Sequence, residues 1–327
     1  MNIRHIAVSI CLLSHAAIAQ PTLWQPGFSG SISINAGFGQ NQSQQNTHDD
    51  NALTTTLNSD GKQTKHATPF ILGRLQYNTG NTLIYIGNSE DQITQAQFQA
   101  ELGVAQRISK SAILTGAVFA NLPGMDEVWR DPYLINQDRQ TSEQQVAGVR
   151  VAADFSTFFP ISVKYAYAQN NIEQDEIGAS QNLSASQRDM LDRESQYQRF
   201  GSEFTFPLHR ALVISPALYY TVRNAKGQAH SFSQLSAQLS LTYSHQQHTL
   251  ITTVRNSSTA FEQENPVFDS KQDQQSMGIF SVYSYAGVFG WRNTQLNIMA
   301  GYQTTDSDID FYNSQDSFVS TGMSYNF

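Results

Sequence analysis

The stretch Val319-Ser320-Thr321-Gly322-Met323-Ser324-Tyr325-Asn326-Phe327 at the end of the sequence decides the fold class. Larger, mostly apolar residues alternate in it with small or polar ones. Successive side chains of a β-strand point to opposite faces, so the stretch predicts a strand with one apolar and one polar face. Such a strand, ending in an aromatic residue, is typical of bacterial outer-membrane barrels. We interpret Tyr325 and Phe327 as the signal that the barrel assembly machinery reads.

The same alternation recurs along the chain. It is cleanest in 95–106, 234–243 and 295–303, where Leu, Ala, Val, Ile and aromatic residues alternate with Gln, Ser, Asn and Glu. In a helix the Gln residues would fall within the apolar stripe, whereas a strand separates the two sets completely. The pattern therefore predicts many strands that are apolar on one face and polar on the other.

Fourteen candidate strands follow from this pattern. They are 28–39, 69–78, 82–88, 95–108, 112–120, 143–155, 160–169, 196–206, 211–222, 231–243, 249–256, 274–285, 293–303 and 316–327. Strand 82–88 alternates poorly and Pro216 interrupts 211–222, so twelve strands are the alternative count. A soluble secreted β-sandwich would also alternate, but it would not require connections of alternating length.

The connections between these strands alternate in length. Long ones, expected outside the cell, are 40–68, 121–142, 170–195, 257–273 and 304–315. Two connections on the same side, 89–94 and 223–230, are of modest length, and the others are short turns, expected in the periplasm. We therefore predict an all-β protein, a transmembrane antiparallel up-and-down β-barrel of about 14 strands. An even count lets the first strand pair with the last and leaves no edge exposed to lipid.

The amino terminus predicts export. Arg4 and His5 precede a short apolar run, 6–13, and 17–19 form an A-x-A cleavage site. This pattern predicts a cleaved signal peptide over 1–19, followed by one barrel domain over 20–327. With the barrel pattern, it predicts location in the outer membrane of a Gram-negative bacterium.

Composition excludes several classes of function. The formal net charge is −8, and cleavage at the predicted site would make it one unit more negative, which argues against nucleic-acid binding. The only cysteine, Cys11, lies in the predicted signal peptide, so no disulfide is expected in the mature chain. Beyond the signal, no apolar run reaches the roughly 20 residues that a membrane helix needs.

Several stretches resemble an uncharacterised gammaproteobacterial family of predicted outer-membrane barrels, a domain of unknown function. They are Gln25-Pro26-Gly27-Phe28-Ser29-Gly30, Trp129-Arg130-Asp131-Pro132, Leu191-Asp192-Arg193, Asn265-Pro266-Val267-Phe268, Asp308-Ile309-Asp310-Phe311-Tyr312 and Gly322 to Phe327. The resemblance covers essentially the whole mature chain. It implies an envelope barrel and supplies no activity, substrate or site residues.

Charged residues on the polar face of the strands are the candidate lumen residues. They are Arg74, Glu101, Arg150, Lys164, Glu203 and Arg255. Opposed charges across a pore would orient water and select solutes. Alternatively, they would form salt bridges that fill and stiffen the barrel.

The rest of the predicted lumen is rich in Gln and Ser, which suits small hydrophilic solutes. We therefore predict a porin-like diffusion channel. The alternative is a non-conducting structural or surface-interaction barrel, adhesin-like or receptor-like, whose long loops make the contacts.

The predicted outer loops supply the remaining candidates. Asp306, Asp308 and Asp310 alternate in 304–315, which suits Ca²⁺ or the cations that bridge lipopolysaccharide, although the spacing is not that of an EF-hand. In 183–194, Ser186 and Asp189 resemble a capping box, predicting a short helix that either gates the mouth or caps it from outside. Outer-membrane lipid and lipopolysaccharide are the expected surroundings of the barrel. Apart from Ca²⁺ at this loop, no cofactor is expected.

Enzymatic chemistry is not expected. The histidines beyond the predicted signal fall in turns, in loops or at a strand start, and none shares a strand face with Ser and a carboxylate or amide. No zinc motif, phosphate loop or cofactor fingerprint occurs.

Overall fold

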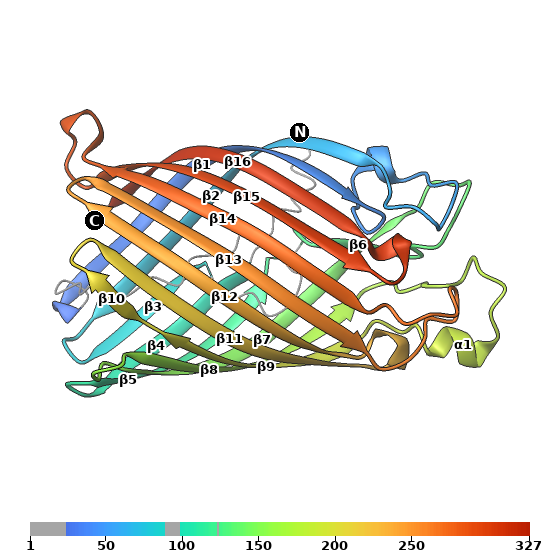
Figure 1. Cartoon of the computed structure of the whole chain (residues 1–327), viewed down its shortest axis with the longest axis horizontal. Helices are drawn as coiled ribbons and strands as arrows, with labels where there is room; N and C mark the ends of the chain where they lie inside the picture. Colours follow the sequence, from blue (N-terminus) through green and yellow to red (C-terminus); the bar gives the residue numbers. More distant parts are fainter. Residues whose placement is uncertain (1–23, 89–98, 123) are drawn as a thin grey trace.

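A closed barrel of antiparallel strands forms the body of the molecule (Figure 1). The computed structural model describes residues 24–88, 99–122 and 124–327. Its strands are β1 (Gly27–Ser43), β2 (Gln63–Asn78), β3 (Thr82–Asn88), β4 (Gln99–Ser109), β5 (Ala112–Asn121), β6 (Glu127–Trp129), β7 (Thr141–Phe155), β8 (Ile161–Ile172), β9 (Ser195–Phe204), β10 (Phe206–His209), β11 (Leu212–Ala225), β12 (Phe232–His245), β13 (His248–Phe261), β14 (Gln274–Ala286), β15 (Thr294–Ser307) and β16 (Ser314–Asn326). The predicted signal peptide lies outside the described residues.

Fourteen of these strands form the wall, as predicted. Among the described residues, the short strand β6 pairs only with β7, and β10 follows β9 after a break at Thr205. β1 pairs with β16 and β9 pairs with β11, so the sheet closes on itself. Closure satisfies the backbone hydrogen bonds that lipid cannot satisfy.

The helices are short and lie in the connections. They are α1 (Ala185–Asp189) and the 3₁₀ turns η2 (Asp49–Asn51), η3 (Gln228–His230), η4 (Val288–Gly290) and η5 (Asp310–Tyr312). Within the described ranges, no helix has the length and apolar character needed to cross a membrane. Long connections gather at one end of the barrel and short turns at the other, as the sequence predicts (Figure 1).

The last strand has the two faces that its sequence predicts. Val319, Tyr325 and Phe327 are about half exposed on the outer surface, where lipid would cover them, whereas Ser320 is 3% exposed. The Phe327 N–H donates to Gly30 O at 3.0 Å, and the Gly30 N–H donates to Phe327 O at 2.8 Å. The last residue is therefore held directly against the first strand.

The observed strand bounds agree best with the predicted ones at the periplasmic end of the barrel. β3 has the predicted bounds, whereas β1, β2, β13 and β15 extend four to six residues further toward the long loops than predicted. Most residues of these extensions are polar on both faces, because strands above the lipid need no apolar surface. The alternation signal therefore ends before the hydrogen-bonded strand does. Of the predicted strand 95–108, residues 95–98 lie outside the described part of the chain.

Pro216 does not disrupt the wall. It pairs in register with Leu239 of β12, while on its other side β9 and β10 are interrupted at Thr205. Because Pro has no N–H to donate, its position opposite this break removes no regular ladder bond on that side.

The inner wall is less uniformly polar than predicted. At mid-height Phe70, Phe280, Val282 and Met299 form a buried cluster, with Leu72 and Phe318 packed against it. Directly paired glycines make room for the inward rings: Tyr85 lies over Gly103, Phe119 over Gly148, Tyr219 over Gly201 and Phe318 over Gly301. These interlocked pairs fill part of the lumen, so a lining of Gln and Ser alone was an incomplete prediction.

Candidate functional site

The predicted lumen charges on β2 to β7 form one network along the wall. The Arg150 guanidinium donates to both oxygens of Glu101, at 3.1 and 2.5 Å, and the pair is almost fully buried. Tyr85 Oη donates to Glu101 Oε1 at 2.5 Å. The Arg74 guanidinium lies over the Tyr85 ring, 3.9 Å from its centroid. Both partners of the ion pair are thus hydrogen-bonded, as a buried pair requires.

The remaining predicted charges divide into two groups. Lys164 Nζ lies 3.7 Å from Glu203 Oε2, between the adjacent strands β8 and β9. Arg255, on β13, donates to Gln238 Oε1 at 3.3 and 2.9 Å. Both ion pairs therefore run along one wall instead of across the lumen, which is the arrangement expected of stiffening salt bridges.

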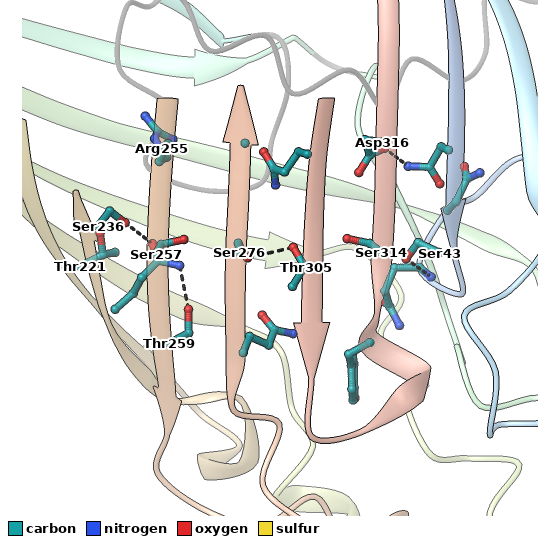
Figure 2. Close-up of a pocket in the computed structure, with 18 of the residues that line it drawn as sticks. Ser43, Thr221, Ser236, Arg255, Ser257, Thr259, Ser276, Thr305, Ser314 and Asp316 are labelled. Atoms are coloured by element: carbon teal, nitrogen blue, oxygen red, sulfur yellow. Dashed lines mark hydrogen bonds between the residues drawn. The ribbon is translucent and has the colours of Figure 1, made fainter. Parts of the chain in front are cut away.

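A polar cavity of about 460 Å³ occupies the extracellular half of the lumen. Its wall from β12 to β1 carries a row of hydroxyl side chains on successive strands, with Ser276 and Thr305 hydrogen-bonded at 2.9 Å (Figure 2). The row consists of Ser236, Ser257, Ser276, Thr305, Ser314 and Ser43, each paired in register with the next. Hydroxyls donate and accept hydrogen bonds, so this wall suits water and hydrophilic solutes.

Arginines are the main charged residues of this cavity. Arg193, Arg199, Arg223 and Arg255 line it, together with the carboxylates of Asp126, Glu127 and Asp316. Within the described chain neither Arg223 nor Arg255 forms an ion pair. The β9-to-β13 side of the cavity is therefore the more basic side.

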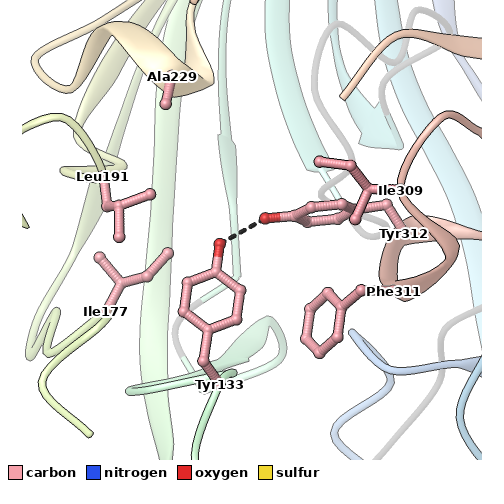
Figure 3. Packing of buried hydrophobic residues seen from close by; sticks show 7 residues of the cluster. All are labelled: Tyr133, Ile177, Leu191, Ala229, Ile309, Phe311 and Tyr312. Carbon is pink, nitrogen blue, oxygen red and sulfur yellow. Dashed lines mark hydrogen bonds between the residues drawn. The ribbon is translucent and has the colours of Figure 1, made fainter. Parts of the chain in front are cut away.

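The extracellular loops close over this cavity in a common apolar core, here called the loop cap. The cap comprises residues 44–62, 124–140, 173–194, 226–231, 262–273 and 308–313. Each segment contributes to the core, through Leu57, Tyr133, Leu191, Ala229, Phe268 and Phe311 respectively. Figure 3 shows Tyr133 and Tyr312 meeting between Leu191 and Ala229 on one side and Ile309 and Phe311 on the other.

The core of the cap joins opposite walls of the barrel. Tyr133 follows β5 and Tyr312 precedes β16, and these strands lie five positions apart by the shorter path around the wall. A fourteen-stranded barrel has a backbone diameter of roughly 27 Å. The two hydroxyls nevertheless lie 2.5 Å apart, and Asn265 Nδ2 donates to both at 2.9 Å. The mouth is therefore spanned by packed side chains.

Burial changes the protonation of the cap. Desolvation raises the pKa of Tyr133 to about 12 and holds the pKa of Tyr312 well above its ordinary value. Desolvation, with the nearby Arg223 and Arg193 charges, holds the pKa of His230 well below 6.5. In the part of the chain that the structure describes, the buried His230 Nε2 has no hydrogen-bond partner. Both hydroxyls and the imidazole are thus neutral in the closed cap near pH 7.

Two arginines fasten the cap loops to each other. Arg193 pairs with Asp175 at 2.6 Å and donates to Trp129 O and Arg130 O at 2.8 and 3.0 Å. Arg139 donates to Gln44 O at 2.9 Å and to Asn51 O, and burial lowers its pKa to about 10. Residues 124–140 are therefore tied to the segments on both sides.

One loop prediction needs correction. The helix α1 is capped by Ser184 and Gln187, not by Ser186 and Asp189, because Ser184 is the residue with extended backbone before the first turn. The helix buries no residue and lies on the outside of the cap. Asp306, Asp308 and Asp310 are exposed, and among the described residues no three His, Cys, Asp or Glu side chains are placed to hold a metal ion.

The residues that build the cap were missed as site residues, although many of them fall in four of the stretches that carry the family resemblance. Trp129 to Pro132, Leu191 to Arg193, Asn265 to Phe268 and Asp308 to Tyr312 are far apart in sequence and meet in the cap. The position of these four stretches in predicted loops was the signal from which a shared loop structure could have been predicted.

Comparisons with known proteins agree with this architecture. The family described as "Protein of unknown function (DUF2860)" matches residues 27–326. No curated protein matches the chain. The similar solved structures include the CymD monoaromatic hydrocarbon channel, with 8% identity, a TM-score of 0.50 and coverage of 100% of this chain and 95% of that one.

Two other solved structures are similar to the chain at a slightly lower level. A Pseudomonas aeruginosa FadL homologue has 9% identity, a TM-score of 0.48 and coverage of 97% and 95% of the two chains. In-vitro folded OmpT, an outer membrane protein of Vibrio cholerae, has 7% identity, a TM-score of 0.48 and coverage of 92% and 97%. At these identities the likeness concerns the barrel fold alone.

Proposed function

The chain belongs to the DUF2860 family of proteins of unknown function, and we propose from its own geometry that it is a gated outer-membrane channel for small hydrophilic solutes. The polar cavity beneath the loop cap carries this proposal, because it places hydroxyl, amide and guanidinium groups along the path that a solute would take. The observed state would be the closed one, with the cap as its gate. No catalytic step forms part of the proposal.

The cap has features suited to a gate. Its apolar core and hydrogen bonds come from loops that emerge from all sides of the barrel, whereas the wall beneath is one continuous hydrogen-bonded sheet. Loops can therefore separate without breaking the barrel ladder. The Tyr133, Tyr312 and Asn265 group is the point where the two sides meet.

Replacing Asn265 with Ala is expected to raise the open probability in planar lipid bilayers about tenfold over wild type. The change removes two hydrogen bonds from buried hydroxyls, a loss of about 1–3 kcal/mol for the closed state. Wild type is expected to show discrete conductance steps separated by long closed periods. The exposed residue Asn182 provides the matched control, and Asn182→Ala should behave like wild type.

The second candidate function is a non-conducting surface barrel. The fully packed cap and the apolar cluster at mid-height favour it, because both occupy the lumen with side chains. If neither wild type nor Asn265→Ala gives steps, although heat-modifiable electrophoretic mobility shows folded barrels, this second function replaces the channel.

The closed cap is expected to lose stability as the pH falls below 6.5. An opened cap exposes His230 to water, where it binds a proton near pH 6.5, whereas the buried imidazole has a much lower pKa. The open state therefore binds more protons in this range, and acid favours it by up to about tenfold per pH unit. Above pH 6.5 the full contribution of the neutral imidazole is present.

Open probability at pH 7.5 and pH 5.0, in wild type and His230→Gln, checks this expectation. The variant keeps a polar side chain and should lose most of the added opening at pH 5.0. An equal acid response in both proteins would assign the effect to other groups.

A further inference from the structure

The inner wall holds a small niche beside Arg255, at Gly278 of the neighbouring strand. Arg255 and Gly278 are directly paired in register, and both line the cavity. A Cβ atom on Gly278 would have only ordinary contacts, the nearest being Tyr302 O at 3.5 Å. By contrast, a Cβ on Gly201 or Gly301 would lie 2.6 or 2.4 Å from an aromatic ring. The space at Gly278 is therefore not filled by a neighbouring aromatic side chain.

Arg255 is oriented and has spare donors. Its Nε and Nη2 donate to Gln238 Oε1, which fixes the plane of the guanidinium. No carboxylate pairs with it among the described residues, and it is partly exposed to the cavity. A guanidinium presents five N–H donors in a fixed fork, so donors remain for a planar carboxylate in the niche.

Hydroxyl groups continue from this niche toward the cap. Ser257 lies two residues beyond Arg255 on β13, and Ser276 lies two residues before Gly278 on β14, about 7 Å along the wall. Both point into the cavity, and Ser276 is hydrogen-bonded to Thr305 (Figure 2). A ligand of several carbons would reach from the guanidinium to this row.

The other charges of the cavity limit the choice of ligand. Asp316 lies three strands from Arg255 in the same register row, about 14 Å away. Its carboxylate accepts a hydrogen bond from Asn41. An α-amino acid is too short to bridge Arg255 and Asp316 with its two charges. The niche therefore favours an anion whose remaining groups are neutral and hydrogen-bonding.

We propose that Arg255, the niche at Gly278 and the hydroxyls of Ser257 and Ser276 form a binding subsite for small hydroxylated carboxylates, of the sugar-acid type. The inference rests on the proposed channel function and names its solute class. Arg255 binds the carboxylate, and the serine row binds the hydroxyl groups.

Isothermal titration calorimetry of the detergent-purified barrel tests the subsite, with gluconate as probe and glucose and propionate as partial probes. Gluconate should bind at least about tenfold more tightly than either, because only gluconate carries both recognised groups. Arg255→Gln should weaken gluconate binding about tenfold and leave glucose binding unchanged. Gly278→Ala, which fills the niche without a clash, should also weaken it, whereas the outward Gly116→Ala should not.

Each titration is repeated in protein that also carries Asn265→Ala, so that a closed cap does not hide the subsite. No gluconate binding in either protein, equal binding of propionate or glucose, or unchanged binding in both Arg255→Gln and Gly278→Ala would overturn the proposal. Because calorimetry requires no conductance, binding without channel steps would reject only the channel. Channel steps without gluconate binding would reject only the subsite.

Discussion

Replacing Arg193 with Met is expected to open the extracellular mouth permanently while leaving the barrel wall folded. The substitution leaves the Asp175 carboxylate without its buried partner and removes the donor for two carbonyl groups, at Trp129 and Arg130. Removing one partner of a buried ion pair costs about 3–5 kcal/mol. The ion pair lies within 173–194, and the bonds to the two carbonyl groups join this segment to 124–140, so that free energy is lost from the cap and not from the wall.

Limited proteolysis and single-channel recording together check this result. The loops of Arg193→Met should be cleaved at least about a hundredfold faster than those of wild type, with a correspondingly higher open probability. Lys226→Gln is the matched control, because it removes an exposed ion pair with Glu194 in the same region. Unchanged cleavage and conductance in Arg193→Met would show that this ion pair does not hold the cap.

Replacing Gly103 with Ala is expected to be the most damaging small change in the barrel wall. Its Cβ would lie 2.3 Å from the Tyr85 ring, so the ring must move and release its hydrogen bond to Glu101. Overpacking and the broken buried network together should cost about 3 kcal/mol of unfolding free energy. Gly116 pairs with Val104 on the adjacent strand and faces outward. A Cβ added there would have no neighbouring atom within 4 Å, so Gly116→Ala is the matched control.

Denaturant unfolding of refolded protein in detergent, followed by fluorescence, measures the difference between these two variants. A second change, Tyr85→Ala, removes the ring that the new methyl group contacts. If the interlocked pair is the cause, Gly103→Ala should cost less in the Tyr85→Ala background than alone. Equal costs in both backgrounds would contradict this explanation.

The sequence predicted the wall because the environment that each residue of a strand faces, lipid or lumen, determines whether that residue is apolar or polar. Alternation from Val319 to Phe327 requires no knowledge of distant residues, and the same local rule located even the short strand 82–88. The rule fails where its cause is absent. In β1 beyond Gly39, neither face meets lipid, so hydrogen bonding alone continues the strand.

The candidate site was only partly predictable. Strand period predicts that Glu101, Arg150 and Arg255 point inward. In the structure Glu101 and Arg150 are buried against each other and Arg255 lines the cavity. The register between strands decides which charges form ion pairs, and a local sequence pattern does not specify that register. The sequence therefore left open whether these charges oppose each other across the lumen or join along its wall.

The sequence by itself determined an antiparallel barrel with polar and apolar faces, because lipid and backbone hydrogen bonding constrain each strand separately. Only the tertiary structure decided that Tyr133, Asn265 and Tyr312 meet over the mouth. It also decided that Gly278 leaves space beside Arg255 whereas Gly103 is filled by Tyr85. Loop contacts and the filling of a lumen depend on side chains brought together from distant strands, and these contacts leave no periodic trace in the sequence.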